Sequence, residues 1–448
     1  MKGDDEGMLA DIRSLFDGSS DLLTDTLDNG FWQMEIAYFP NLCDERIKDG
    51  LLVPFSYRFD PDEFRRMLHS NPKYQEANNN KDWPNLLLKG YVLIQIEEQC
   101  YSFKSDRSLV TEADTTEVEA SLQGPQSALT EDLDVNLYLI RTRYNVPSLA
   151  TVPYEKGNYS HTAIMILYDK KFVNDKVLKL LHKQLDKMNI DLLQASGQLV
   201  KELTDKSHRF FPTLLQTERP DRVAVMLRRG KVVILLNGSR FAVILPVRLF
   251  DFMHAMDDDY ESFWISCFLI VMRYCAITLT ILLPALYVAI VSYNPEIFRV
   301  QLAFTIDGSR AGVPYPSFVE VFIMLFMIEA LIEASIRLPR FVGSTATTVG
   351  GLILGQAAQQ AGLVSSIMII VTSVVAISNF VIPNSTFSQS IRLIKYWFVI
   401  IAMIYGITGI AVLFFVLIVY LCNLRSFGEP YFALFTPRAN DLTGQRKG

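Results

Sequence analysis

Hydrophobic positions change their pattern near residue 262. Before that point they come in short stretches: residues 33–39 alternate like a strand, and residues 129–144 place their apolar side chains on one helical face. After it, apolar residues form long runs such as 364–377, embedded in segments near the ~20 residues that cross a ~30 Å hydrocarbon core. The pattern predicts an α/β N-terminal module followed by an all-α integral membrane domain.

The N-terminal module is expected to contain two α/β subdomains. An Asp/Ser/Gly-rich arm at 1–30 precedes a first subdomain at 31–147 and a second at 148–250, and an acidic linker at 251–262 leads to the membrane domain. The predicted elements are strands at 33–39, 86–98 and 162–168, helices at 129–144 and 174–188, and a hairpin of 231–236 with 241–245. Asn237-Gly238 suits the hairpin turn because this pair adopts positive φ easily.

The membrane domain, residues 263–425, contains four clear apolar segments and one that is ambiguous. The clear segments are 263–291, 318–336, 363–382 and 396–421. Residues 343–362 are rich in Gly, Ala, Thr and Gln, too polar for lipid contact although uncharged. Polar backbone at membrane depth is tolerated only where protein or water covers it, so we expect this piece inside an assembly. A tail at 426–448 follows.

Charge and composition exclude several classes of function. The net charge is −6, its acidic excess lies before residue 262, and no dense Lys/Arg patch occurs, which argues against a nucleic-acid partner. The five cysteines form no C-x-x-C pair and are expected to be packing residues in a reducing compartment. Enzyme signatures are absent, and we expect no catalysis, cofactor or metal; Asp257–Asp259 is interpreted as solvated linker.

Two features orient the chain in a membrane. The acidic N-terminus lacks the apolar core of a secretory signal, so the N-terminal module is expected in the cytoplasm. Arg337 and Arg340, and likewise Arg392 and Lys395, are expected in loops on that same side. Segments 263–291 and 318–336 then form a hairpin, and 343–382 crosses an even number of times or re-enters. A single last crossing would leave the tail outside, whereas the basic residues of the tail favour the inside, so its side stays open.

Charged residues inside apolar segments are the first candidates for function. A charge costs at least ~2.5 kcal/mol at a helix centre on insertion scales, so these side chains should face protein or water. The candidates are Arg273, Glu320, Glu329, Glu333 and Arg337. Glu329, Glu333 and Arg337 share one helical face, whereas Glu320 points away and needs another partner. Either a cation pathway or a structural ion pair is compatible with this pattern.

The Gly-rich piece supplies a second group. Its smooth helical face permits close backbone approach, and other positions on the same helix offer uncharged amides to a neighbour or to a water-filled path. The packing or pore-lining candidates are Gly351, Gly355, Ala358, Gly362, Gln356 and Gln359.

Several motifs resemble the A subunit of bacterial spore germinant receptors. They are SLQGPQSALTEDLDVNLYLIRTRY (121–144), FFPTLLQTERPDRVAVMLRRGKVVILLNGSRFAVILP (210–246), VPYPSFVEVF (313–322), RLPRFVGSTATTVGGLILGQAAQQAGLVS (337–365), SNFVIP (378–383) and RSFGEPY (425–431). The resemblance implies a nutrient-sensing complex in the inner membrane of an endospore, with a permease-like B subunit and a lipoprotein C subunit. It also implies an A subunit that oligomerises and forms the ion-conducting part.

Two rival functions remain open. A secondary transporter would show an inverted repeat with paired broken helices, and the sequence shows one Gly-rich segment without a second copy. A scaffold that only docks the permease-like subunit fits the same sequence. The germinant and the stoichiometry are not readable, and no ligand residue is assigned.

Overall fold

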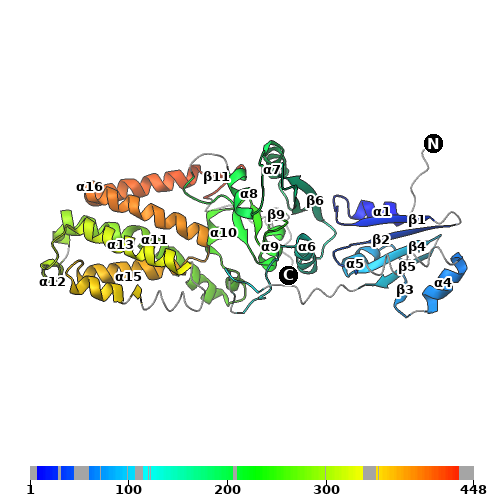
Figure 1. Cartoon of the computed structure of the whole chain (residues 1–448), viewed down its shortest axis with the longest axis horizontal. Helices are drawn as coiled ribbons and strands as arrows, with labels where there is room; N and C mark the ends of the chain where they lie inside the picture. The colour runs from blue at the N-terminus through cyan, green and yellow to red at the C-terminus, as the bar shows by residue number, and fades with distance from the viewer. Residues whose placement is uncertain are drawn as a thin grey trace.

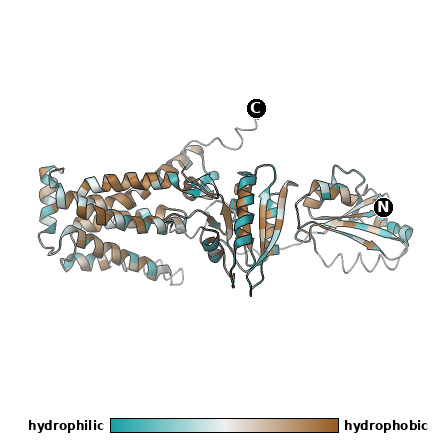
Figure 2. Ribbon diagram, turned by 90° about the horizontal axis from the view of Figure 1, so that it is seen from above, coloured by the Kyte–Doolittle hydropathy of each residue, from teal (hydrophilic) through white to brown (hydrophobic). Residues whose placement is uncertain are grey.

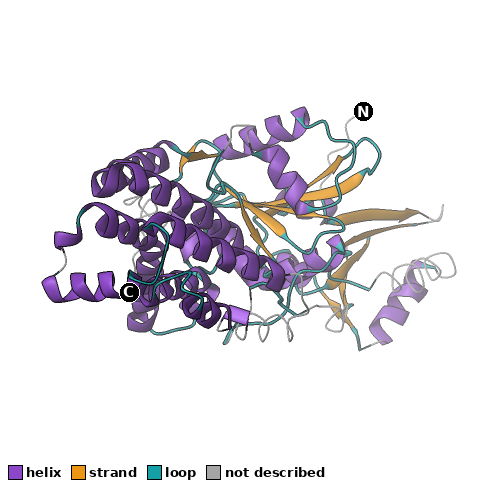
Figure 3. Ribbon diagram, turned by 60° about the vertical axis from the view of Figure 1, so that its left-hand side comes forward, coloured by secondary structure: helices purple, strands orange, loops and turns teal. Residues whose placement is uncertain are grey.

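Three bodies lie in a row along the molecule: a first sheet, a second sheet and a helical part (Figure 1). The computed structural model describes residues 8–28, 32–44, 60–70, 72–97, 99–105, 115–119, 121, 123–204, 209–297, 299–336, 350–351 and 353–432. Strands occur in both sheets and in a short pair at residues 425–430, whereas the long helices gather at one end (Figure 3).

The first sheet is antiparallel, with strand order β1-β2-β4-β5-β3. Its strands are β1 (Leu23–Asp28), β2 (Gln33–Tyr38), β3 (Tyr74–Glu76), β4 (Tyr91–Ile96) and β5 (Gln99–Lys104). Helices α1 (Met8–Leu15) and α5 (Trp83–Leu88) cover one face, and α4 (Pro61–Ser70) covers the other.

Two segments of this sheet differ from expectation. The residues expected as an arm include α1 and strand β1, which pairs with β2 and completes the sheet edge. Residues 86–88 close α5 instead of opening a strand, because Pro84 suits a first helical turn and Gly90, at φ +78°, ends the helical region before β4.

The second sheet has strand order β6-β7-β9-β10-β8, again antiparallel. Its strands are β6 (Leu149–Lys156), β7 (Thr162–Asp169), β8 (Leu215–Thr217), β9 (Val232–Leu236) and β10 (Ala242–Leu245). Helices α6 (Leu133–Arg143) and α9 (Pro220–Arg228) cover one face, and α7 (Asp175–Lys187) and α8 (Ser196–Leu203) cover the other. The β9–β10 hairpin turns through Asn237-Gly238, with Gly238 at φ +78°, as the pattern predicts.

Helix α6 packs on the second sheet, although it was expected in the first subdomain. Leu137 and Ile140 join Val233 in one core. The buried side chains of Arg141 and Asp21 form an ion pair of 2.7 Å, which ties α6 to the segment before β1. The helical period could be read from sequence, but the sheet that this helix covers depends on non-local packing.

The helical part consists mainly of long apolar helices (Figure 2). The helices of this part are α11 (Phe263–Tyr293), the shorter and more polar α12 (Val300–Arg310), α13 (Ser317–Ile336), α15 (Ser366–Val381) and α16 (Ser385–Asn423). Residues 350–351 and 353–360 are also helical. Within the described ranges, α11 and α16 are the two helices long and apolar enough to cross a membrane. Helix α16 begins 11 residues before the predicted 396, capped by Asn384, whose side chain accepts from Phe387 N at 3.0 Å.

Helix α16 is a helical hairpin, not one rod. Gly406 has non-helical φ +59° and ψ −145° at its middle. The ring of Phe211 lies 5.6 Å from that of Phe387 and 6.3 Å from that of Tyr420, between centroids. A straight helix would separate those two positions by about 50 Å. The chain therefore runs out to Gly406 and returns.

The tail consequently lies beside the second sheet, which corrects the expectation of a single last crossing. Ser426 Oγ donates to Thr213 O at 2.7 Å and accepts from Val247 N at 3.1 Å. Strands β11 (Arg425–Ser426) and β12 (Glu429–Pro430) pair just before the buried Tyr431. Residues 433–448, with their basic side chains, lie outside the described residues.

The helices run between a module end, next to the second sheet, and a far end. At the far end, the hydroxyls of Ser292 and Ser317 lie 2.5 Å apart, and Tyr293 donates to Met403 O at 2.5 Å. Helix α15 starts at the far end as well, because its cap Ser365 bonds Tyr287 at 3.2 Å. In the described chain, α11, α13, α15 and the two arms of α16 thus run between the ends, and the helical residues up to 360 lead toward the far end, where Gly362 lies against Gly312 O.

Candidate functional site

Glu329 is held by two basic side chains from the first arm of α16. Its Oε1 accepts from Lys395 Nζ at 2.7 Å, and its Oε2 accepts from Arg392 Nε at 2.8 Å. Lys395 is fully buried. Because α16 begins at Ser385, both basic residues lie inside a helix and not in the expected loop.

The expected face of Glu329, Glu333 and Arg337 is therefore described only in part. Glu333 is exposed, and Arg337 lies outside the described residues. The spacing within one helix could not reveal Arg392 and Lys395, since they are more than sixty residues away in the chain.

Glu320 forms a second buried site at the far end. Its Oε1 accepts from the backbone N of Ser365 at 2.6 Å and from Ser365 Oγ at 2.5 Å. Its Oε2 lies 3.3 Å from the Tyr287 hydroxyl and 3.5 Å from Arg310 Nε. The carboxylate thus sits at the N-terminus of α15, where an anion is favoured.

Arg273 anchors α11 to the segment that precedes it. It donates to Met253 O at 3.1 Å and forms two contacts with the buried carboxylate of Asp258, one of them at 2.9 Å. Asp258 lies in a 3-10 turn (Met256–Asp259) that follows α10 (Leu249–Met253). This corrects the interpretation of the acidic run as a solvated linker, because a buried arginine is the partner of its central residue.

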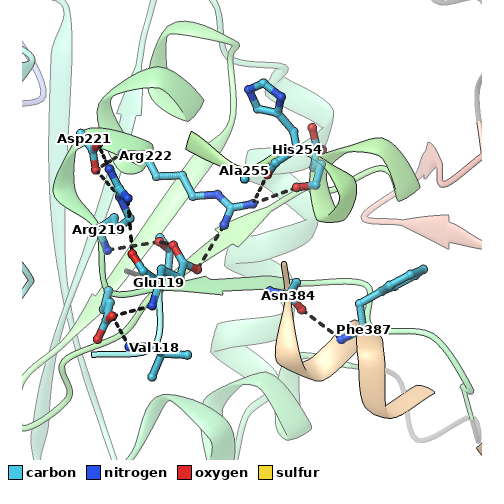
Figure 4. Close-up of polar contacts among 12 residues, drawn as sticks. Val118, Glu119, Arg219, Asp221, Arg222, His254, Ala255, Asn384 and Phe387 are labelled. Carbon is cyan, nitrogen blue, oxygen red and sulfur yellow. Dashed lines mark hydrogen bonds and ion pairs between the residues drawn. The ribbon is translucent and has the colours of Figure 1, made fainter. Parts of the chain in front are cut away.

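A polar joint connects the second sheet to this same segment (Figure 4). Arg222 donates to Glu119 Oε1 at 3.1 Å and to the carbonyls of Asp251 and His254 at 2.8 and 3.3 Å. Arg222 from α9 and Arg273 from α11 therefore both bind the segment 251–258.

Two further contacts complete the joint. Glu218 Oε1 accepts from the backbone N–H groups of residues 117, 118 and 119 at 2.7, 2.5 and 2.8 Å. Arg219 pairs with Asp221 at 2.6 Å. Burial alone would raise the pKa of the Asp221 carboxyl, but the hydrogen bond and charge of Arg219 outweigh it and hold that pKa below its usual range.

Sequence reasoning missed this joint as a site. The signal was present: residues 217–222, TERPDR, place four charges around a proline between apolar stretches. Across the described residues, no group of three or more His, Cys, Asp or Glu side chains could hold a metal ion. The arrangement connects the second sheet to the segment that precedes α11.

The family of the chain follows from a comparison with known proteins. The family model described as Bacillus/Clostridium GerA spore germination protein matches residues 10–445. The chain belongs to this GerA family.

Curated GerA relatives agree over much of the chain. Spore germination protein B1 of Bacillus subtilis (strain 168) is 39% identical over 310 residues, 69% of this chain and 64% of that protein. Spore germination protein GerQA of Bacillus cereus is 32% identical over 436 residues, which are 96% of this chain and 87% of that protein. Spore germination protein KA of Bacillus subtilis (strain 168) is 36% identical over 319 residues, which are 71% of this chain and 59% of that protein. The matches thus span less than two thirds of B1 and of KA.

A solved structure also matches. The N-terminal domain of the A subunit of the Bacillus megaterium spore germinant receptor GerK3 is 25% identical, with a TM-score of 0.41, and the match covers 53% of this chain and 92% of that chain.

The Gly-rich piece of this GerA-family chain packs inside its own subunit. A Cβ at Gly351 would lie 3.5 Å from Leu331 of α13, and one at Gly355 would lie 3.9 Å from Ile369 of α15. Ala358 is buried, and Gly362, at φ +67°, lies against Gly312 O at the far end.

The amides of the same helix point outward. Gln356 and Gln359 are exposed, and Gln359 donates to Ser366 Oγ at 3.0 Å. The glycine face and the amide face are thus separate, as the helical spacing indicates.

Proposed function

We propose that this chain is a membrane subunit of a nutrient-responsive spore germination receptor and that it oligomerises to form the ion-conducting part of the complex. The relatives are named as spore germination proteins, and the matched solved domain as part of a germinant receptor A subunit. By this account its partners are a permease-like B subunit and a lipoprotein C subunit. The complex is located in the spore inner membrane, and the N-terminal module lies on the cytoplasmic side, which in a spore is the core.

The observation that carries the membrane assignment is the apolar outer surface of the helical part. Trp264 is 80% exposed, Phe380 68% and Phe415 67%. Other exposed large apolar side chains on these helices are Phe263, Phe268, Phe326, Ile370, Ile377, Trp397 and Tyr405. So large an apolar surface is unfavourable in water and is typical of contact with lipid or with another subunit.

The return of the chain supports a single cytoplasmic side for both sheets and the segment after α16. Helix α11 begins next to the second sheet, and the segment after α16 packs on that sheet again. If a membrane surrounds the helices, residues 425–432 and both sheets then lie on the same side of it.

The amide face supports oligomerisation. Lipid does not favour the exposed amides of Gln356 and Gln359, because each amide group without a hydrogen-bond partner in hydrocarbon costs several kcal/mol and the contact of Gln359 with Ser366 uses only one of its groups. Subunits arranged around a common axis would place these uncharged groups on water, which a cation path requires. We therefore assign the outward face of 350–360 to that path.

Cation flux through purified subunit in vesicles, with and without its partners, tests the proposal. We expect a flux that the partner subunits and nutrient control and that Gln356→Leu reduces at unchanged protein level, whereas Ile353→Leu, on an exposed apolar position of the same helix, leaves it normal. A scaffold would give no flux in any combination. Flux coupled strictly to movement of a solute would instead favour a transporter.

A further inference from the structure

The contact between α11 and α15 contains polar side chains at seven-residue intervals on both helices. We call this set the polar seam; it consists of Arg273, Thr280 and Tyr287 with Ser365, Thr372 and Asn379. Each of the six is less than one-tenth exposed. Seven residues are nearly two helical turns, so each set stays on one face of its helix.

One hydrogen bond sets the register of the seam. Tyr287 and Ser365 lie with their hydroxyl oxygens 3.2 Å apart, and the two helices run in opposite directions. One step of about 10 Å toward the module end therefore brings Thr280 level with Thr372. A second step brings Arg273 level with Asn379.

From its middle to its module end, the seam has more polar groups than protein partners. Among the described residues, Thr280 Oγ1 and both amide atoms of Asn379 are buried without a hydrogen-bond partner. Pro284 lies four residues after Thr280 inside α11 and has no N–H, so the Thr280 carbonyl also lacks its helical donor. Unpaired groups of this kind cost about 1–3 kcal/mol each unless a small polar molecule pairs them.

Charged groups stand at both ends of the seam. Glu320, with its bonds to Ser365 and Tyr287, lies at the far end, and the Arg273–Asp258 pair lies at the module end. Between them only uncharged hydroxyls, an amide and a freed carbonyl occur. Such groups form hydrogen bonds with water and carry no charge that would hold an ion tightly.

We propose that the polar seam binds a continuous file of water inside each subunit, open to the bulk at the module end. This inference rests on the proposed membrane placement and deepens it, because it locates water inside the subunit in addition to the amide face. Water supplies donors to Thr280 and both donors and acceptors to Asn379, and it reaches the freed carbonyl, as at proline positions in membrane helices generally.

Silver ion is a suitable probe because it is small, travels through water and binds cysteine thiolates. In a full complex without native cysteines, Thr280→Cys and Asn379→Cys should be protected by silver from later maleimide labelling of the unfolded chain. The matched controls are Ala285→Cys on α11 and Val371→Cys on α15, which are also buried but face away from the seam, and they should stay unprotected. Asn237→Cys, in the exposed hairpin turn, shows that the reagent is active.

Lack of protection at both seam positions, in variants of normal abundance, would overturn the proposal, as would equal protection at the controls. If a cysteine variant does not accumulate, water-edited magnetic-resonance spectra of the unmodified complex answer the question: transfer from water to Thr280 and Asn379 supports the seam, and its absence refutes it. Both readouts are independent of ion flux, so a subunit that conducts nothing would refute the proposed function and leave the seam to be judged separately.

Discussion

Individual buried charges in the helical part have partners from distant segments. Glu329 pairs with Arg392 and Lys395, and Glu320 caps α15. Neutralisation of this kind removes most of the cost of placing a charge at membrane depth. We therefore propose a structural role for Glu329, with Lys395 as the residue most dependent on it because Lys395 is fully buried.

Glu329→Gln tests this role. The change leaves Lys395 without its counter-charge, and removal of one partner of a buried pair costs about 3 kcal/mol or more. We expect lower subunit abundance, with normal cation release per assembled complex. Immunoblots of membranes combined with cation release from spores measure both quantities.

Two variants serve as controls for that experiment. Glu333→Gln, one turn along and exposed, should accumulate normally. Glu329→Gln combined with Lys395→Met should recover part of the lost abundance, because the fully buried charge of Lys395 is then removed and only the partly exposed Arg392 lacks a partner. Normal abundance with reduced flux in Glu329→Gln alone would place Glu329 on the cation path instead.

At the scale of elements, two glycine positions decide the shape of the helical part. Gly406 turns α16 back on itself, and Gly355 allows the 350–360 helix to approach α15. The first depends on a backbone conformation and the second on space, so substitutions should act differently.

Gly406→Ala should destabilise the hairpin. A residue with a side chain at φ +59°, ψ −145° is strained by about 1–3 kcal/mol, and the new Cβ would lie 3.2 Å from the Tyr293 ring. We expect a lower Tm of the purified subunit in detergent. Gly308→Ala is the matched control, since a Cβ there meets nothing within 4 Å. Equal Tm values for both variants would show that the turn does not need glycine.

Gly355→Leu should disturb the packing of the 350–360 helix. A Cβ already lies at ordinary contact distance from Ile369, so the three further carbons of leucine force the helices apart, at about 1–3 kcal/mol. We expect failed assembly while the two sheets still resist limited proteolysis. Gly355→Ala fits the space and should assemble. A Leu variant that assembles and responds normally would refute close packing at this face.

The period of apolar residues was enough to find most of these elements, but their partners were not readable. The β9–β10 hairpin and helix α11 follow from local signals, Asn237-Gly238 and a long apolar run. The return of α16 depends on one glycine inside an uninterrupted apolar stretch, so hydropathy shows a single segment. The joint of Arg222 and Arg273 depends on contacts to backbone carbonyls, which no residue spacing encodes.

At the scale of the whole molecule, the soluble bodies and the helical part are connected at one end. The segment 251–258 is held by Arg222 on the sheet side and Arg273 on the helix side, and residues 425–431 return to the same place. A displacement of the second sheet would therefore act on α11 and α16 together. Under the proposed membrane placement, both connections lie on one side of the membrane.

Cysteine labelling with an impermeant reagent tests that arrangement most directly. In intact cells that express the subunit on a cysteine-free background, Asn237→Cys in the hairpin turn and Arg425→Cys after α16 should both remain unlabelled until the membrane is permeabilised. Glu296→Cys, exposed at the far end, should label at once. Labelling of position 425 or 237 in intact cells, or protection of position 296, would contradict a helical domain that spans the membrane with its soluble bodies on the inner side.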